Sequence, residues 1–298
     1  MRRLNPIGWF GGKNFMLKRL LPILEGIPHM RYVEPFGGGA VVLLNKRPVE
    51  LEVYNDIDAG LHNFFVVLAD SELFAAFRRR VETLPYSRRL FEECRKDWKT
   101  ETERVKRAAQ WFVLARQSFG ADFAHSQGSW GSVTSSSSRG MARTCAGWLS
   151  AIEKLPEVSA RLRRVQIENQ DWRTILDRYD SPDTLFYLDP PYVHSMRRGK
   201  NYVHEMTDED HKELVQVVMR LQGKVVVSGY PNEIYRPLKS AGWEKREYEV
   251  ACHAAGRTRA TGLKGLGATH RNDGAQRRTE AVWIQPYKAE DNLWGKKT

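Results

Sequence analysis

The stretch at residues 185–192 constrains the fold of this chain more than any other, because an apolar run there ends in Asp-Pro-Pro-Tyr. The run has the composition of a buried strand. Proline has no N–H for a sheet ladder and disfavours helix in the preceding residue, so the strand ends at Asp189. Ligands of open α/β sheets bind outside the carboxyl ends of the strands. The Asp189 carboxylate and the flat ring of Tyr192 therefore predict a site for a planar, amino-bearing ligand. A structural turn is the alternative.

A second strand-turn-helix pattern lies near the amino terminus. Residues 32–36 predict a strand, glycines 37–39 a turn, and residues 40–45 the start of a helix. About twenty residues beyond the first glycine, a second predicted strand runs into Asp56. A glycine turn followed by an acid at the end of the next strand is typical of sites for cofactors with an adenosine half. The glycine string departs from the GxGxxG pattern of nicotinamide enzymes, whereas the arrangement fits any cofactor with an adenosine half.

The segment Gly-Trp-Phe-Gly-Gly-Lys at residues 8–13 precedes an apolar pattern of helical spacing that runs to Leu24. Glycines before a lysine and a helix make a turn that can accept an anion. The spacing is not that of a P-loop, so a nucleoside triphosphate is a poor candidate. Lys13 could meet a carboxylate instead. A glycine turn packed against Trp9 is the plainer alternative.

Strands and helices alternate on both sides of a central helical region, which predicts an α/β sheet interrupted by a helical insert. We expect residues 1–62 and 165–298 to form the sheet domain and residues 63–164 to form the insert. Within the insert, residues 121–143 hold few apolar side chains and predict a long surface loop or a loose hairpin. Residues 253–277 are rich in glycine and arginine and predict no regular structure.

The formal net charge is +11, and it is concentrated in arginine clusters interleaved with aromatic residues. This distribution favours a nucleic-acid partner over a membrane surface, although solvated basic faces also occur in soluble proteins. No apolar run approaches the roughly 18 residues of a membrane span, and the amino-terminal residues lack a signal-peptide pattern. The three cysteines show no zinc spacing. We therefore expect a cytoplasmic protein with reduced thiols and no metal.

Four pieces in this order resemble Dam-like (D12 class, alpha-type motif order) adenine-specific DNA methyltransferases of bacteria and phages. They are residues 8–13, 34–40, 55–58 and 189–192. Residues 227–230 and 278–283 also look like this family. The resemblance implies a Rossmann-like S-adenosylmethionine-dependent methyltransferase sheet with an inserted, mainly helical target-recognition subdomain. It also implies S-adenosylhomocysteine as product. Ala40 departs from the pattern, since the family often has a second glycine there.

The resemblance also implies roles for individual residues. Asp189 and the Pro190 carbonyl would accept hydrogen bonds from the amino group of the target adenine, and Tyr192 would stack on this base after it leaves the duplex. Lys13 would lie near the methionine carboxylate of the cofactor and Asp56 at its ribose. The implied catalytic residues are Asp189, Pro190, Pro191 and Tyr192. The implied cofactor-binding residues are Trp9, Lys13, Phe36, Gly37, Gly38, Asp56, Ile57, Asp171, Trp172 and Asp189.

The expected partner is double-stranded DNA, with single-stranded DNA or RNA possible, and a monomer is favoured. The DNA-binding candidates by position or charge are Arg116, Gln117, Ser118, Trp130, Arg139, Arg197, Arg198, Arg257 and Arg259. Three alternatives remain open: an enzyme acting on the exocyclic amino group of cytosine, an RNA methyltransferase, and a catalytically silent DNA-binding module. The cytosine class prefers Ser-Pro-Pro-Tyr, so Asp189 argues for adenine.

Overall fold

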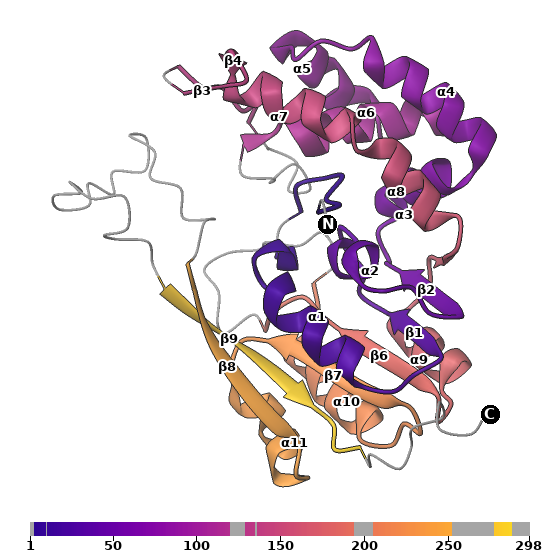
Figure 1. The fold of residues 1–298 in the computed structure, drawn as a ribbon, viewed down its shortest axis with the longest axis vertical. Coiled ribbons are helices and arrows are strands. Elements are labelled where there is room, and N and C mark those ends of the chain that lie inside the picture. The colour runs from indigo at the N-terminus through magenta and orange to yellow at the C-terminus, as the bar shows by residue number, and fades with distance from the viewer. Residues whose placement is uncertain are drawn as a thin grey trace, which may run out of the picture.

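The computed structural model describes residues 3–9, 11–119, 129–134, 136–193, 205–251 and 277–287. Its centre is a seven-stranded sheet in the order β5-β2-β1-β6-β7-β9-β8 (Figure 1). The strands are β1 (Arg31–Glu34), β2 (Leu51–Asn55), β5 (Gln166–Glu168), β6 (Thr184–Leu188), β7 (Lys224–Gly229), β8 (Glu244–Ala251) and β9 (Arg277–Ile284). The five strands from β5 to β7 are parallel, and β9 runs antiparallel to both β7 and β8.

Two apolar cores cover the two faces of this sheet, as expected for a mainly parallel sheet buried on both sides. On one face, Leu185 and Tyr187 of β6 pack with α1 (Leu17–Gly26) and α2 (Val41–Asn45). On the other face, Phe186 and Leu188 pack with residues of α9 (Trp172–Tyr179), α10 (Asp208–Val218) and α11 (Arg236–Ser240). Successive side chains of a strand point to opposite faces, so residues 185–188 contribute side chains to both cores. The predicted α/β class is confirmed.

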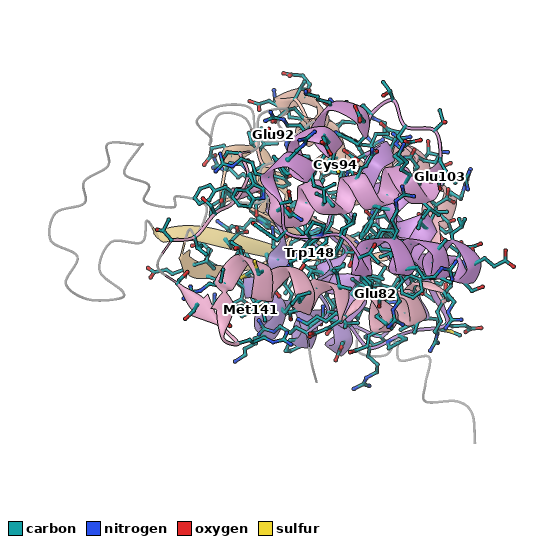
Figure 2. All side chains as sticks on the ribbon, turned by 90° about the horizontal axis from the view of Figure 1, so that it is seen from above. Glu82, Glu92, Cys94, Glu103, Met141 and Trp148 are labelled. Atoms are coloured by element: carbon teal, nitrogen blue, oxygen red, sulfur yellow. The ribbon has the colours of Figure 1, made fainter. Side chains whose placement is uncertain are left out.

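Six helices of the described chain lie beyond one face and one end of the sheet (Figure 1). They are α3 (Ala59–Ala69), α4 (Ser71–Glu82), α5 (Arg88–Asp97), α6 (Arg104–Gln117), α7 (Arg143–Ile152) and α8 (Leu155–Leu162). Phe64, Phe77, Trp111, Phe112 and Trp148 are buried among them and contact one another ring to ring. Figure 2 looks onto this layer, with Trp148 near its middle. These aromatic rings belong to the same core as α1 and α2, so the helices are packed firmly onto the sheet.

Residues 137–142 of the predicted surface loop form a small hairpin of β3 (Ser137–Ser138) and β4 (Met141–Ala142). Arg139 and Gly140 form its two-residue turn with φ of 56° and 73°, which is the type I′ geometry that matches the twist of a hairpin. The prediction of a loose hairpin is confirmed for this part. Most of the segment predicted without regular structure, residues 252–276, lies outside the described residues.

Element boundaries differ from the predictions by a few residues. Strand β1 ends at Glu34 rather than residue 36, because Pro35 follows it. The helical pattern that follows Thr207 predicts a helix to about residue 222, whereas α10 ends at Val218. Helix α3 starts at Ala59, where the Asp58 side chain accepts hydrogen bonds from two backbone N–H groups. Among the described residues, no helix has the length and apolar character to cross a membrane.

Candidate functional site

A cavity of about 250 Å³ opens at the carboxyl ends of the parallel strands, where the sequence predicts a ligand site. It is lined by the ends of β1, β2 and β6, by the amino-terminal turn and by residues before α9 and α10. Of the predicted cofactor and catalytic residues, the lining includes Trp9, Lys13, Phe36, Gly37, Gly38, Asp56, Ile57, Asp171, Trp172, Asp189 and Pro191. The structure therefore brings together residues that are far apart in the sequence. Pro190 and Tyr192 are buried directly beside this lining.

The glycine turn after β1 is held tightly between two aromatic side chains. A Cβ atom at Gly37 would lie 2.2 Å from the Tyr54 ring, and one at Gly38 would lie 2.7 Å from the indole nitrogen of Trp9. Gly38 also has a φ of 47°, which glycine adopts without strain. Ala40 has a φ of 54° as well. This left-handed backbone conformation explains why the family often has glycine at position 40. Alanine adopts it with a modest backbone strain.

Asp56 closes the turn from the end of β2. One carboxylate oxygen accepts the Gly38 N–H at 2.8 Å, and the other accepts the Asp58 N–H at 2.9 Å. Burial raises the pKa of Asp56 to about 6, and the two backbone hydrogen bonds offset part of this effect. Each oxygen keeps a further lone pair for a ligand hydroxyl. The position and the charge of Asp56 therefore suit the predicted contact with a ribose.

An apolar slot lies on the far side of the turn. The rings of Phe36 and Trp172 lie 6.2 Å apart, and Ile57 beside the cavity is 45% exposed. The Arg173 guanidinium lies 4.3 Å from the centre of the Trp172 ring. It pairs with Asp171 at 3.2 Å, Asp210 at 2.7 Å and Glu213 at 2.5 Å, which anchors the wall of the slot. Apolar walls and nearby polar atoms suit a heteroaromatic ring.

Lys13, Asp189 and Tyr192 form a buried cluster at the end of β6. The Lys13 ammonium lies 2.6 Å from Asp189 Oδ1 and donates to the Tyr192 hydroxyl. The Ser228 hydroxyl donates to the same Asp189 oxygen at 2.9 Å. Burial opposes the charge of Lys13, but Asp189 and Glu280 outweigh it and raise the pKa of Lys13 above its ordinary value. Burial also raises the pKa of Asp189, and Lys13 counteracts this effect in part.

Three residues of this region carry no role in the sequence analysis: Ser228, Tyr230 and Glu280. The Tyr192 hydroxyl contacts the two carboxylate oxygens of Glu280 at 2.9 and 3.1 Å. The Tyr192 and Tyr230 ring centres lie 4.1 Å apart. The sequence analysis notes that residues 227–230 and 278–283 look like the family, but no local spacing connects them with residue 192. Their contact arises from the strand order β6-β7-β9.

Glu34, at the end of β1, is a buried carboxyl group in the cavity wall. The Tyr32 hydroxyl donates to it at 2.7 Å. Burial raises the pKa of Glu34 to about 8; the Tyr32 hydrogen bond lowers it and the neighbouring Asp189 raises it further. A cationic ligand in this cavity would favour the ionised form of Glu34.

The DNA-binding candidates of the insert occupy different environments. The Gln117 side chain is fully buried; its oxygen accepts from the Ser87 N–H at 3.1 Å and the Trp130 indole N–H at 3.3 Å. Arg116 points inward too and donates to the Gly147 carbonyl at 2.9 Å. Ser118 forms a β-bridge with Trp130, and the Arg88 guanidinium lies 5.0 Å from the Trp130 ring centre. Gln117 thus supports the loop that presents Trp130.

Arg139, in the hairpin turn, is exposed and pairs with Glu153 at 2.8 Å. Arg197, Arg198, Arg257 and Arg259 lie outside the described residues. Within the described chain, no group of three or more His, Cys, Asp or Glu side chains is arranged to hold a metal ion.

A search of the curated proteins finds no match to this chain. The profile of one protein family, however, matches residues 9–251. The match begins at Trp9 in the cavity wall and includes the glycine turn, the helical insert and the Asp-Pro-Pro-Tyr cluster. The chain belongs to the D12 class N6 adenine-specific DNA methyltransferase family, and it is an enzyme that transfers a methyl group from S-adenosylmethionine to adenine in DNA.

Proposed function

We propose that the cavity at the carboxyl ends of β1, β2 and β6 binds S-adenosylmethionine and that residues 189–192 hold a flipped-out adenine. The residues present fit this cofactor. Asp56 offers carboxylate oxygens for the ribose hydroxyls, and the Phe36–Trp172 slot offers apolar walls for the adenine ring. Asp189 offers negative charge at the end of the cavity where a sulfonium would lie, and a bound cation would favour the ionised form of Glu34 beside it. The glycine turn lets backbone approach the ligand closely.

The geometry of Asp189 carries this proposal. Both Lys13 and Ser228 contact its Oδ1 atom, and among the described residues no contact is seen at Oδ2. The Asp189 side chain is 19% exposed, so it remains accessible from the cavity. Oδ2 is therefore the atom that can accept a hydrogen bond from an exocyclic amino group.

The bound cofactor supplies the electrophilic methyl group, and the protein orients the amino group. An adenine amino nitrogen is a poor nucleophile because its lone pair is delocalised into the ring. Acceptors at Asp189 Oδ2 and at the Pro190 carbonyl favour a more tetrahedral nitrogen whose lone pair points out of the ring plane. Alignment of this kind, together with fixed charges, supplies most of the rate in reactions that need no covalent intermediate.

Tyr192 is the proposed stacking surface for the flipped base. In this structure it is only 7% exposed, and Tyr230 covers one of its faces. Stacking on a base therefore requires the two rings to separate. The Tyr192 hydroxyl stays anchored to Lys13 and Glu280, so a rotation of Tyr230 is the simpler way to open the site.

We further propose that residues 63–164 form the target-recognition insert and that double-stranded DNA is the substrate of a monomeric enzyme that uses no metal. Support comes from the arginines on the surfaces of α4 and α5 and from Trp130, which contacts Arg88 and Gln117 within the insert. Phe119, at 49% exposure, extends the same aromatic surface. Phosphate contacts by arginine would contribute affinity, and sequence would be read elsewhere.

Substitution of Asp189 by asparagine tests the proposed site in vitro. We expect Asp189→Asn to reduce methyl transfer to duplex DNA by at least about 100-fold, in the range of lost transition-state hydrogen-bond acceptors and charges. S-adenosylmethionine binding, measured by calorimetry, should persist. Asp183→Asn is a matched control, because Asp183 lies at the amino end of β6 and pairs with Arg31. Retained transfer by Asp189→Asn would exclude the proposed role.

A further inference from the structure

Glu280 of β9 is a buried carboxylate directed into the catalytic cluster. It is 3% exposed and lies in the strand that pairs with β7. Both of its oxygens contact the Tyr192 hydroxyl, and Oε2 lies 3.8 Å from the Lys13 ammonium. A buried carboxylate is costly unless it is paired and hydrogen-bonded. Glu280 therefore depends on two residues of the catalytic cluster.

The direction of the hydrogen bonds in this cluster follows from the donors available. A charged lysine has only donors, so Lys13 donates to Asp189 and to the Tyr192 hydroxyl oxygen. The Tyr192 hydroxyl has one proton, which must then go to an acceptor other than Lys13. Glu280 is placed to receive it. These contacts form a hydrogen-bonded network that runs from Asp189 through Lys13 and Tyr192 to Glu280, and the donor of each hydrogen bond is assigned.

This hydrogen-bonded network affects both the orientation of Tyr192 and the charge on Asp189 in the proposed site. Lys13 and Glu280 both form hydrogen bonds with the Tyr192 hydroxyl, so the Tyr192 ring has little freedom to change its orientation. Lys13 is shared between two carboxylates at 2.6 and 3.8 Å, so it does not neutralise Asp189 completely. Without the charge on Glu280, Asp189 would be the one carboxylate in this cluster that pairs with Lys13. Asp189 would then be a weaker hydrogen-bond acceptor.

We infer that Glu280 is a positioning residue for methyl transfer, which orients Tyr192 through its hydroxyl and shares Lys13 with Asp189. This inference rests on the proposed function of residues 189–192. Glu280 acts through Tyr192 and Lys13 and makes no contact of its own with the base. The inference accounts for a buried glutamate on the side of β9 where the next two residues, Val282 and Ile284, are apolar and buried.

The test is a double-mutant cycle with Glu280→Gln and Tyr192→Phe in the full-length enzyme. Glutamine keeps the size and an acceptor oxygen but removes the charge. We expect Glu280→Gln to lower kcat on duplex DNA about tenfold or more, with the Kd for S-adenosylmethionine changed less than twofold. The loss in the double variant should be smaller than the product of the two single losses, because both changes break the Tyr192–Glu280 hydrogen bond. Glu247→Gln is the control, since Glu247 is a half-exposed residue of β8 paired with Lys245.

Wild-type kcat in Glu280→Gln would overturn the inference, and so would losses that multiply in the double variant. If Glu280→Gln does not fold, Glu280→Asp replaces it. Aspartate keeps the charge but falls one methylene short of Tyr192, so the same loss of kcat with intact cofactor binding is expected. An active Asp189→Asn enzyme would instead overturn the proposed function itself. An inactive Asp189→Asn enzyme with an unimpaired Glu280→Gln enzyme would overturn only the role of Glu280.

Discussion

The ammonium of Lys13 lies 2.6 Å from the Asp189 carboxylate and is 2% exposed, so the amino-terminal turn and the Asp-Pro-Pro-Tyr motif form one buried ion pair. The sequence analysis expects Lys13 at the carboxylate of the cofactor. In the structure Lys13 contacts Asp189, Tyr192, Glu280 and the Gly11 carbonyl, and it also lines the cavity. Contacts with Lys13 and Ser228 thus hold the carboxylate that we propose as catalytic.

Replacing Lys13 by methionine should destabilise the folded enzyme and abolish activity. The Asp189 carboxylate would keep its burial and lose its counter-charge, which costs roughly 3 kcal/mol in comparable buried pairs. Urea unfolding measures the loss. The double variant Lys13→Met with Asp189→Asn should regain part of this stability while staying inactive. A double variant no more stable than Lys13→Met alone would argue against a direct pair.

Alanine at Gly37 should impair both folding and cofactor binding. Its Cβ would meet the Tyr54 ring at 2.2 Å, so either the turn or the β2 aromatic must move. We expect a loss of at least about 2 kcal/mol, as for overpacked cores, and a cofactor affinity reduced more than tenfold. Gly147→Ala is the control. Gly147 lies inside helix α7 with nothing within 4 Å of a Cβ, so alanine there should stabilise the protein by up to about 1 kcal/mol.

Cofactor affinity should fall with pH in the range where Asp56 takes up a proton. Its pKa of about 6 means that the carboxylate is largely protonated at pH 5. A hydroxyl ligand prefers the ionised acceptor, so affinity for S-adenosylmethionine should decrease from pH 7 to pH 5. The effect of Asp56 on stability has the opposite sign. The folded state binds this proton more tightly than the unfolded chain, so Asp56 costs stability above pH 6, and this cost disappears as pH falls toward 4.

Calorimetric titrations of wild type and Asp56→Asn over this pH range separate Asp56 from other groups. The variant should bind more weakly at pH 7 and should show a much smaller pH dependence. An equal dependence in both proteins would show that a group other than Asp56 controls cofactor affinity in this pH range.

Gln117 and Arg139 should respond differently to alanine although both are candidates for DNA contact. Gln117→Ala leaves the Ser87 N–H and the Trp130 indole N–H without their acceptor, which costs roughly 1–3 kcal/mol. Arg139→Ala removes only an exposed ion pair and should change stability by less than about 1 kcal/mol. Thermal unfolding of the two variants tests this contrast. Equal stability losses would contradict the buried placement of Gln117.

The arginine-rich segment near the carboxyl end offers a test of electrostatic DNA binding. Alanine at Arg257, Arg259, Arg277 and Arg278 should weaken binding to duplexes of any sequence. The slope of log K against log salt should become shallower by about 0.9 for each lost phosphate contact. Fluorescence anisotropy at several salt concentrations gives this slope. An unchanged slope would indicate that these charges are merely solvated.

The sequence predicts those parts of the fold and site that depend on local pattern. Strands β6 and β7 follow from uninterrupted apolar runs, and the glycine turn and the Asp-Pro-Pro-Tyr stop follow from backbone restrictions at Gly37 and Pro190. Because parallel strands share one carboxyl edge, the same patterns predict that Asp56 and Asp189 line one cavity, as they do.

The remainder depends on topology that no local pattern specifies. Glu280 reaches Tyr192 because β9 inserts between β7 and β8, and a final strand could equally have extended an edge. Gln117 is a DNA-binding candidate because its position resembles that of the DNA-reading hairpin of the family, but it contacts Pro85 and Ser87 at the end of α6 and its side chain is buried. Neither contact has a sequence spacing that could reveal it.

The most direct test of the account is detection of modified bases in DNA from methylation-deficient cells that express wild type, Asp189→Asn or Asp183→Asn. We predict N6-methyladenine in a fixed sequence context for wild type and Asp183→Asn, and none for a folded Asp189→Asn protein that still binds S-adenosylmethionine. N6-methyladenine in DNA from cells with Asp189→Asn, or methylated cytosine alone with wild type, would contradict the assignment of Asp189 to the target adenine.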